Sequence, residues 1–427
     1  MKYIYILFFI LFSLNSILFS QWFSQNSFMQ GIELRSVKFI NVNNGWVIGN
    51  NGTILHTKNS GTNWTNQISG TTNDLYDISF TDINNGWIVG FQGIILNTTN
   101  GGDNWAKQTN PLSGTSNYIY GVTFLDSLNG FAIGYDYDYG NTIIRTTNGG
   151  INWVIQARLN ISARLYKVTF TNPNNGWVVG VLGPTYYFGT ILKTTNGGTD
   201  WISQPCAGAG RLNGITFIDT NNGWAVGSYG TILHTTNGGT DWESQYTGSM
   251  DQTQLQGVTF TDINNGWAVG YDRAYGGTII HTTNGGINWT YQLRGEAKWL
   301  YGVAFFDENN GWAVGENGTI LHTINGGITS IDDKNNNALT KIFSLSQNYP
   351  NPFNPTCVIQ YSIKTAQKVL LKVYDIIGNE ITTLVNEYKS SGDYIVTFNA
   401  NDFSSGVYFY QIRVGNYFET KIMILIK

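Results

Sequence analysis

One sequence pattern recurs along most of this chain, and its period constrains the fold. A complete copy spans residues 212–245 and reads LNGITFIDTNNGWAVGSYGTILHTTNGGTDWESQ. The Asn-Gly-aromatic anchor of this pattern occurs in seven copies, at spacings of 41 to 47 residues, with its aromatic residue at Trp46, Trp87, Phe131, Trp177, Trp224, Trp267 and Trp312. A strand-like repeat of this length, rich in glycine and aromatic residues, predicts the blades of a β-propeller.

Each copy divides into four expected strands. The first is a Leu-x-x-Val-x-Phe run, whose period-2 alternation and β-branched residues are typical of a strand. The second follows the Asn-Gly turn, where we expect glycine to supply a positive φ angle. The third is a Thr-Ile-Leu-His run, and the fourth begins at a Trp-x-x-Gln element. First strands are predicted at residues 34–39, 75–80, 119–124, 165–170, 212–217, 255–260 and 300–305.

The connection between the third and fourth strands has the pattern Thr-x-Asn-x-Gly-x-(Asn/Asp)-Trp, as in residues 98–105. Threonine and asparagine side chains can bond back to backbone amides, and glycine takes a positive φ, so a stiff turn is expected. The pattern resembles the Asp-box (BNR-type) hairpin of sialidase-like propellers, with asparagine in place of the usual aspartate. In that family the box is structural, so its recurrence indicates blades and gives no support to hydrolase activity.

The seventh copy is incomplete, and its missing piece occurs near the other end of the chain. The seventh box, residues 323–329, runs on without a Trp-x-x-Gln element, whereas residues 22–25 read Trp-Phe-Ser-Gln. We therefore expect residues 22–25 to form the outer strand of the last blade, which closes the ring and removes an open sheet edge. The predicted fold is all-β, with a seven-bladed propeller at residues 21–329.

Taken together, the Gly-Trp-x-Val-Gly and Thr-x-Asn-Gly-Gly-x-x-Trp repeats resemble those of the photosystem II stability and assembly factor family, whose members are seven-bladed propellers. The resemblance covers about 300 residues of the sequence and implies this fold. It does not carry the family's function across, because one fold hosts many functions and propellers of this repeat type also occur in exported bacterial proteins.

Residues 1–20 are typical of a signal peptide. Lys2 gives a positive start, residues 4–14 are apolar, and Ser20 is a small residue at a plausible cleavage point. The alternative is a membrane anchor, but the apolar run is short of the ~20 residues that span a bilayer. We expect cleavage, and a mature protein without a transmembrane segment.

The repeat gives way to a polar linker, predicted at residues 330–345, and to a different module at residues 346–427. Its short alternating strands predict a small immunoglobulin-like β-sandwich. The module opens with Tyr-Pro-Asn-Pro-Phe-Asn-Pro and continues with Val-Tyr-Asp-x-x-Gly at 373–378, Ser-Gly-Val-Tyr-Phe at 405–409 and a final Lys427. These motifs resemble the C-terminal sorting domain of type IX secretion, subfamily A. The resemblance implies contact with the type IX secretion machinery and delivery to the outside of a Gram-negative cell, secreted or at the outer surface.

The charge pattern argues against nucleic-acid binding, and the histidine pattern argues against a metal site. Only 12% of the residues are charged and the net charge is −4, whereas a nucleic-acid binder carries a basic stripe. One repeat position carries all four histidines: His56, His234, His281 and His322. Equivalent positions in different blades lie far apart compared with the ~2 Å ligand distances of a zinc site. We therefore expect no metal and no cofactor, and a structural role for the histidines.

Neither the carboxylates nor the thiols form a catalytic pattern. Aspartate recurs in the turn after the first strand but is replaced by Asn41 and Asn172 in two copies, which is typical of a turn former. Cys206 and Cys357 are expected to remain unpaired, because two lone cysteines do not make a disulfide framework. No catalytic residue is assigned.

Function is expected where the copies differ. If the first strand runs down and the second runs up, the loops after the second strand share one face with the starts of the first strands. On that face the third, fourth and sixth copies have longer loops, which add tyrosine and aspartate and are typical of a recognition surface. The alternative is that these insertions only pack over neighbouring loops. The candidate ligand-binding residues are Tyr118, Tyr120, Tyr137, Arg164, Tyr166, Tyr187, Arg211, Tyr275, Trp299 and Tyr301.

We interpret the chain as an exported, monomeric propeller that binds an extracellular protein or glycan through this face. Two alternatives stay open. A glycan-active hydrolase or lyase would need paired carboxylates at the channel mouth, where Glu33 and Asp74 are the nearby acids. An assembly-factor or chaperone-like helper, which the family resemblance suggests, would use Arg164 and Arg211.

Overall fold

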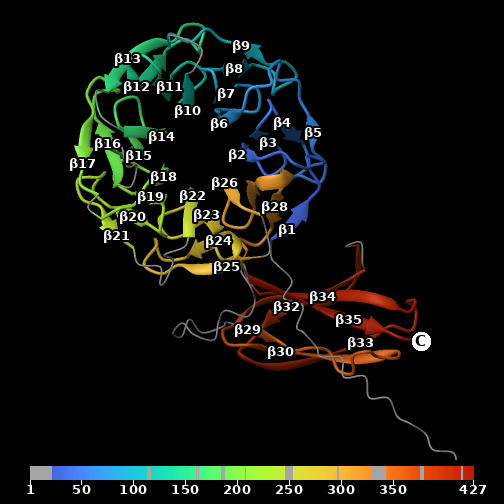
Figure 1. The fold of residues 1–427 in the computed structure, drawn as a ribbon. Coiled ribbons are helices and arrows are strands. Elements are labelled where there is room, and N and C mark those ends of the chain that lie inside the picture. The colour runs from blue at the N-terminus through green and yellow to red at the C-terminus, as the bar shows by residue number, and fades with distance from the viewer. Residues whose placement is uncertain are drawn as a thin grey trace, which may run out of the picture. The chain divides into compact units, whose positions relative to one another are not determined.

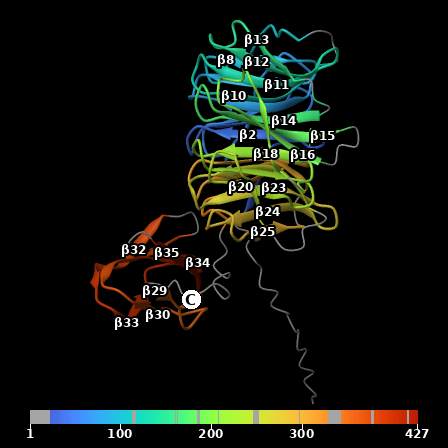
Figure 2. The same ribbon diagram turned by 90° about the vertical axis from the view of Figure 1, so that its left-hand side faces the viewer.

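The computed structural model describes residues 22–112, 117–159, 161, 163–183, 188–206, 208–245, 253–295, 298–327, 343–375, 379–414 and 417–427. The chain divides into two compact units, Met1–Asp332 and Asp333–Lys427. Figure 1 shows the first unit as a ring of sheets viewed face-on, and Figure 2 shows the same ring from its edge. The expected signal peptide and Tyr187 lie outside the described residues.

The described residues of the first unit form seven antiparallel four-stranded sheets, numbered here as blades in chain order. Blades 1 to 3 are β2 (Leu34–Phe39), β3 (Gly45–Gly49), β4 (Ile54–Thr57) and β5 (Thr65–Asn66); β6 (Leu75–Phe80), β7 (Gly86–Gly90), β8 (Ile95–Thr98) and β9 (Ala106–Lys107); and β10 (Tyr118–Phe124), β11 (Gly130–Asp136), β12 (Gly140–Thr146) and β13 (Val154–Leu159). The first strand of each blade is innermost, and the fourth is outermost (Figure 1).

Blades 4 to 6 repeat this order. They are β14 (Ala163–Phe170), β15 (Gly176–Leu182), β16 (Phe188–Thr194) and β17 (Ile202–Gln204); β18 (Leu212–Phe217), β19 (Gly223–Gly227), β20 (Ile232–Thr235) and β21 (Glu243–Ser244); and β22 (Thr253–Phe260), β23 (Gly266–Asp272), β24 (Gly276–Thr282) and β25 (Thr290–Arg294). The seven-bladed fold predicted from the repeat is confirmed.

Blade 7 joins the two ends of the propeller. Its strands are β26 (Leu300–Phe305), β27 (Gly311–Gly315), β28 (Ile320–Thr323) and β1 (Phe23–Gln25), with a short 3-10 turn, η1 (Glu316–Gly318), between β27 and β28. β1 pairs antiparallel with β28, so that Phe23 lies opposite His322. Trp22, just before β1, is buried. The expected closure of the ring by the N-terminal strand is therefore confirmed.

Aromatic side chains form the contacts between neighbouring blades. All five residues of β7 (Gly86–Gly90) are buried, and the ring of Trp87 stacks on Phe124 of the next blade at 3.5 Å between centroids. The indole N–H of Trp87 also donates a hydrogen bond of 2.9 Å to the carbonyl of Gly149 in the box of that blade. Burying aromatic side chains of this size contributes most of the free energy that holds such blades together.

The Trp-x-x-Gln element forms a second contact between neighbouring blades, which we call the glutamine latch. Gln67 Nε2 donates to the carbonyl of Gly101 at 3.1 Å, and Gln67 Oε1 accepts from Trp105 Nε1 at 3.1 Å. The same pair of bonds recurs at four more seams, through Gln25, Gln108, Gln245 and Gln292. Gln156 donates instead to Thr199 Oγ1, and Gln204 donates to the carbonyl of Ile202 in its own strand.

The turn between the first two strands differs from expectation in one respect. The glycine of its Asn-Gly pair, such as Gly86, does not adopt a positive φ angle. Glycine is required there because an added Cβ would overlap the ring of Phe80. The turn itself is held by Asp82, whose Oδ1 accepts from the backbone N–H groups of Asn84 and Asn85 at 2.7 and 3.0 Å. This confirms that the recurring aspartate is a turn former.

Two sheets are formed by the part of the second unit that the structure describes. One has the order β29 (Phe343–Leu345), β30 (Thr356–Ile363), β33 (Gly392–Asn399), and the other β32 (Glu380–Lys389), β31 (Gln367–Tyr374), β34 (Gly406–Val414), β35 (Tyr417–Leu425). Side chains from both sheets form one buried core. β29 lies within the stretch interpreted as a linker. β32 is largely polar, whereas Phe343 and Leu345 of β29 are buried in the core, and both strands pair with strands of the core sheets.

The sorting-domain motifs have structural roles in this sandwich. The backbone of Phe353, in the Tyr-Pro-Asn-Pro-Phe-Asn-Pro motif, accepts from Ile426 N–H and donates to the carbonyl of Ile424, so the motif covers the free edge of β35. Tyr410 Oη donates to the carbonyl of Ser346 and accepts from Asn348 N–H, both at 2.8 Å. Covering an edge strand in this way prevents pairing with other chains.

Candidate ligand-binding face

The loops between the second and third strands share one face of the ring with the starts of the innermost strands. Asn51, in such a loop of blade 1, donates its N–H to Asp74 Oδ1 just before the innermost strand of blade 2. Phe91 forms a bridge with Tyr118 in the same way between blades 2 and 3. The face inferred from the strand directions is therefore present, and we call it the loop face.

A cluster of tyrosines lies on the loop face over blades 2 to 4. Tyr120 stacks on Tyr118 at 5.4 Å and on Tyr76 at 5.7 Å, and it meets Tyr166 edge-on at 5.9 Å between ring centroids. Phe91 extends the cluster, with its ring 5.0 Å from that of Tyr118. The tyrosine rings are half-buried, so each has a fixed packing partner and a part that solvent reaches.

Burial keeps the hydroxyls of this cluster protonated. It raises the pKa of Tyr76 to about 12, and the nearby carboxylate of Asp74 adds to the effect. Burial also raises the pKa of Tyr120, which the positive charge of Arg164 partly offsets. At neutral pH both side chains therefore offer an O–H donor together with an aromatic surface.

Two arginines flank the tyrosine cluster on blades 4 and 5. The guanidinium of Arg211 lies over the ring of Tyr166, with its carbon 4.3 Å from the centroid, and the Arg211 side chain is exposed. Arg164 is also exposed and interacts electrostatically with Tyr120. An arginine stacked on a ring keeps its N–H donors available for a carboxylate or carbonyl of a ligand.

A second aromatic group lies over blades 6, 7 and 1. Trp299 stacks on Tyr271 at 4.0 Å, with the rings nearly parallel, and 41% of Trp299 is exposed. The guanidinium carbon of Arg35 lies 5.0 Å from the centre of the Tyr301 ring. Burial and the charge of Glu33 raise the pKa of Tyr301 to about 12.

The long loops of blades 3 and 6 extend the hairpin between the second and third strands. In both, an arginine of the fourth strand lies over a tyrosine of the loop. In blade 6, Arg294 donates to Asp272 Oδ2 at 2.8 Å while its guanidinium lies 4.2 Å from the centre of the Tyr275 ring. In blade 3, the guanidinium of Arg158 lies 3.5 Å from the centre of the Tyr139 ring. Tyr137, at the tip of the blade 3 loop, is 71% exposed. These loops are braced by their own blade.

Nine of the ten candidate residues are thus distributed among three groups, and the tenth, Tyr187, lies outside the described residues. Tyr118, Tyr120, Tyr166 and Arg211 lie in or against the tyrosine cluster, with Arg164 beside it. Trp299 and Tyr301 belong to the second group, and Tyr137 and Tyr275 lie on the separate loops. The list of candidate residues omits Tyr76, Phe91 and Tyr271, although each occupies a position where the repeats differ.

The acids considered for a hydrolase are engaged in local contacts. Glu33 pairs with Arg35 and accepts from Asn50 Nδ2 at 3.2 Å, and Asp74 holds the neighbouring loop through the N–H of Asn51. These contacts position loops and give no support to a general acid and base pair. Among the described residues, no cluster of three or more His, Cys, Asp or Glu could hold a metal ion.

The histidines and cysteines have structural environments. His56, His234, His281 and His322 each stack on the tryptophan of their own blade, at 4.5 to 4.6 Å between ring centroids. Burial lowers the pKa of His56, His281 and His322 to about 4. Both cysteine thiols are free.

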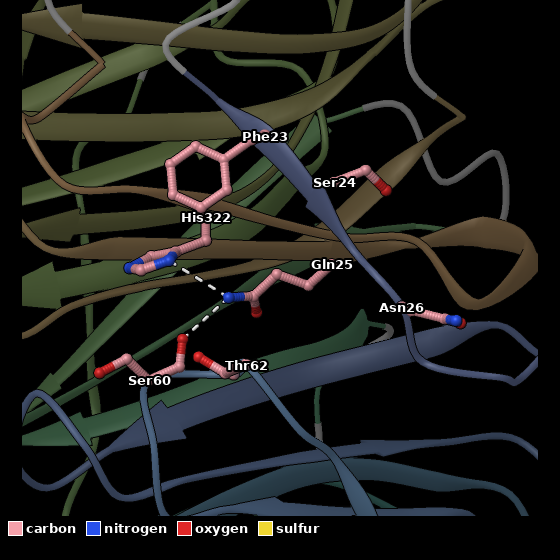
Figure 3. A pocket seen from close by; sticks show the side chains of 8 residues that line it. Phe23, Ser24, Gln25, Asn26, Ser60, Thr62 and His322 are labelled. Carbon is pink, nitrogen blue, oxygen red and sulfur yellow. Dashed lines mark hydrogen bonds between the residues drawn. The ribbon is translucent and has the colours of Figure 1, made fainter. Parts of the chain in front are cut away.

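A pocket of about 430 Å³ lies at the seam where β1 meets blade 1 (Figure 3). Gln25 Nε2 lies 2.8 Å from the carbonyl of Ser60 and 3.2 Å from His322 Nδ1, and the Phe23 ring lies edge-on to His322 at 4.9 Å. The residues lining the pocket carry no charge at neutral pH and include the glutamine latch. We therefore assign this pocket a role in ring closure.

Comparisons with known proteins agree with the fold. The family described as "Photosynthesis system II assembly factor YCF48" matches residues 66–157, 153–245 and 208–298, which together span more than half of the chain. The family described as "Secretion system C-terminal sorting domain" matches residues 347–427. A comparison with curated protein sequences gave no match.

Solved structures show the same architecture. The chain is similar to "YCF48 bound to D1 peptide", with 21% identity and a TM-score of 0.58 over 71% of this chain and 95% of that chain. YCF48 from Cyanidioschyzon merolae gives 21% identity and a TM-score of 0.57 over 71% of this chain and 98% of that one. PorZ, titled an essential bacterial surface component of the type-IX secretion system of Porphyromonas gingivalis, gives 13% identity and a TM-score of 0.52, over 95% of this chain and 59% of PorZ.

The fold and the C-terminal module define a seven-bladed propeller of the Asp-box type that carries a secretion signal. The chain belongs to the YCF48 family of photosystem II assembly factor propellers, here joined to a type IX sorting domain. The sorting domain places the protein outside the cell, secreted or at the surface. No helix in the described part of the chain is long and apolar enough to cross a bilayer.

Proposed function

We propose that this exported propeller binds an extended segment of another protein across the tyrosine cluster and the two arginines beside it. The observation that carries the proposal is the continuous contact from Tyr76 through Tyr120 and Tyr166 to Arg211, which spans four blades. Rigid aromatic rings with polar ends bury a large contact area at a small entropic cost.

The charges beside the cluster favour an acidic segment. Arg164 and Arg211 are both exposed, and the guanidinium of Arg211 is already held in place by Tyr166. A guanidinium fixed in this way loses little freedom when it pairs with a carboxylate. A structural relative of this family is titled as bound to a peptide, which agrees with recognition of a protein segment on such a fold.

The proposal is tested with the full chain on an array of peptides that differ in charge. We expect acidic peptides to bind, and the double variant Arg164→Ala/Arg211→Ala to bind them roughly tenfold or more weakly, because central aromatic and arginine contacts dominate interface energies. The control is Lys58→Ala/Lys107→Ala, which removes the same charge at exposed positions away from the cluster.

Equal binding by the arginine double variant and the wild type would refute the proposal. A parallel glycan array distinguishes the other ligand class. Glycan binding that survives in Arg164→Ala/Arg211→Ala, without any peptide binding, would assign the face to saccharides and overturn the protein-segment proposal. The variant Tyr137→Ala/Tyr275→Ala tests whether the separate loops of blades 3 and 6 contribute to either ligand.

A further inference from the structure

Two positions on each innermost strand face the next blade around the central channel of the ring. Ser36 Oγ of blade 1 donates to Asp77 Oδ1 of blade 2 at 3.2 Å, and Ser79 Oγ of blade 2 accepts from the N–H of Phe124 in blade 3 at 3.1 Å. These two positions form two levels in the channel. The strand registers identify the equivalent residues in the other blades.

The first level contains one ion pair and is otherwise made of small residues. Its members are Ser36, Asp77, Gly121, Lys167, Gly214, Gly257 and Gly302. Lys167 Nζ of blade 4 reaches past blade 3 to Asp77 Oδ1 of blade 2, at 2.5 Å. Asp77 is buried, and it also accepts from Ser36 and from the N–H of Val122. Its carboxylate is therefore already supplied with three donors.

The second level contains one more lysine and several hydroxyl side chains. Its members are Lys38, Ser79, Thr123, Thr169, Thr216, Thr259 and Ala304. Among the described residues, no acceptor forms a hydrogen bond or ion pair with Lys38 Nζ. Burial lowers the pKa of Lys38, the positive charge of Lys167 lowers it further, and Asp77 offsets only part of the effect.

The two levels together carry two lysine amines, Lys38 and Lys167, and one carboxylate, Asp77. Placing an unpaired ammonium in a partly desolvated site costs free energy, and an anion bound beside it offsets that cost. Four threonines on the level of Lys38 are half-buried residues, and a threonine hydroxyl can donate a hydrogen bond to an anion. This combination of a cation and neutral donors suits the oxygens of an oxyanion.

We propose that the channel binds a small oxyanion, such as sulfate or phosphate, between Lys38 and the threonine ring, with Lys167 adding positive charge from the level above. The site is separate from the loop face, and the proposal does not rest on the function assigned to that face. Asp77 opposes the anion, so its charge sets how tightly the anion binds.

The test is the shift in melting temperature of the full chain with sodium sulfate or sodium phosphate, compared with sodium chloride at equal ionic strength. We expect the oxyanions to stabilise the wild type more than chloride does, and Lys38→Met to lower the apparent affinity at least tenfold. Asp77→Asn removes the opposing charge, so it should increase the affinity several-fold even if it lowers the melting temperature. Lys107→Met, at an exposed position on the outer strand β9, is the matched control and should change nothing.

A purely structural role for these residues predicts a different result. Both variants would then melt at lower temperature with unchanged dependence on the anion. The proposal is overturned if oxyanions stabilise the wild type no more than chloride, if Lys38→Met keeps the full anion effect, or if Asp77→Asn weakens it. Should Lys38→Met fail to fold, the opposite sign expected for Asp77→Asn still decides the question.

Discussion

The outer and inner parts of the propeller differ in how closely their residues repeat from blade to blade. Towards the outer edge, the same contacts recur from blade to blade, such as the tryptophan bonded to the next box and the glutamine latch. At the innermost strands, equivalent positions carry Asp77 in one blade, Lys167 in another and glycine in four more. We infer that residues repeated in every blade stabilise the scaffold, whereas positions that differ between blades are available for binding.

The largest expected effect on the scaffold comes from acid, because three blades carry a buried histidine at the same repeat position: His56, His281 and His322. The pKa of His56, His281 and His322 is lowered to about 4 in the folded state, so the unfolded chain binds more protons as the pH falls below about 6.5. The neutral histidines make their full contribution to the free energy of unfolding above pH ~6.5, and this contribution decreases towards pH ~4. At pH 5 the loss is roughly 2 kcal/mol for each of the three histidines.

Denaturant unfolding at pH 7 and pH 5 measures this loss. The repeat supplies the matched variant, since blade 2 carries Asn97 at the histidine position, where its Nδ2 donates to the carbonyl of Gly86. His281→Asn should therefore lose less stability than the wild type between the two pH values. The turn aspartates, whose pKa values are lowered, respond only below pH ~4 and do not contribute to this interval. Equal losses in both proteins would contradict the histidine account.

The next largest effect is expected at the closure of the ring. Trp22 is buried, meets Phe305 edge-on at 5.7 Å and donates to Gln292 Oε1 at 3.0 Å. Trp22→Ala should lower the free energy of unfolding by about 3–5 kcal/mol, as for other buried aromatic truncations. Phe23→Ala is the control, because 43% of that side chain is exposed, and should cost much less. Similar losses in the two variants would show that Trp22 does not close the ring.

A smaller effect compares two copies of the same glutamine. Gln108 forms the latch with the carbonyl of Gly149 and with Trp153, whereas the one hydrogen bond of the Gln156 side chain within the described residues goes to the hydroxyl of Thr199. Gln108→Ala leaves a partly buried indole N–H without its acceptor and should cost about 1–3 kcal/mol. Gln156→Ala should stay within about 0.5 kcal/mol of the wild type. Thermal melts of the two variants measured side by side decide this, and a larger loss for Gln156→Ala would be the contrary result.

The repeat made the scaffold predictable, because each copy reports the same local strands and turns. The Trp-Phe-Ser-Gln segment at residues 22–25 was assigned to the last blade only because six other copies show what the seventh lacks. Contacts between blades that involve residues particular to one copy follow no repeated spacing. The ion pair of Asp77 with Lys167 joins residues 90 positions apart and two blades apart, and the Asn-Gly glycine is required by a ring six residues before it rather than by its φ angle.

The sequence predicted where the loop face lies, but it did not predict every residue that takes part in its aromatic contacts. Strand direction placed its loops and strand starts together, and residues that differ between copies identified Tyr120, Tyr166 and Arg211. The stacking that joins Tyr76 and Phe91 to them depends on side-chain orientation, which a pattern of residue types does not encode. Aligning the seven copies would have identified Asp77 and Lys167, since both stand where other blades carry glycine.

The central claim is that repeated residues hold the ring and divergent residues bind the ligand. Its most direct test measures both peptide binding and the free energy of unfolding in Gln108→Ala and in Arg164→Ala/Arg211→Ala. The account predicts that Gln108→Ala loses stability and binds peptides like the wild type, while the arginine variant keeps its stability, within about 0.5 kcal/mol, and loses binding. Loss of binding in the latch variant under conditions where it is folded, or full binding by the arginine variant, would contradict it.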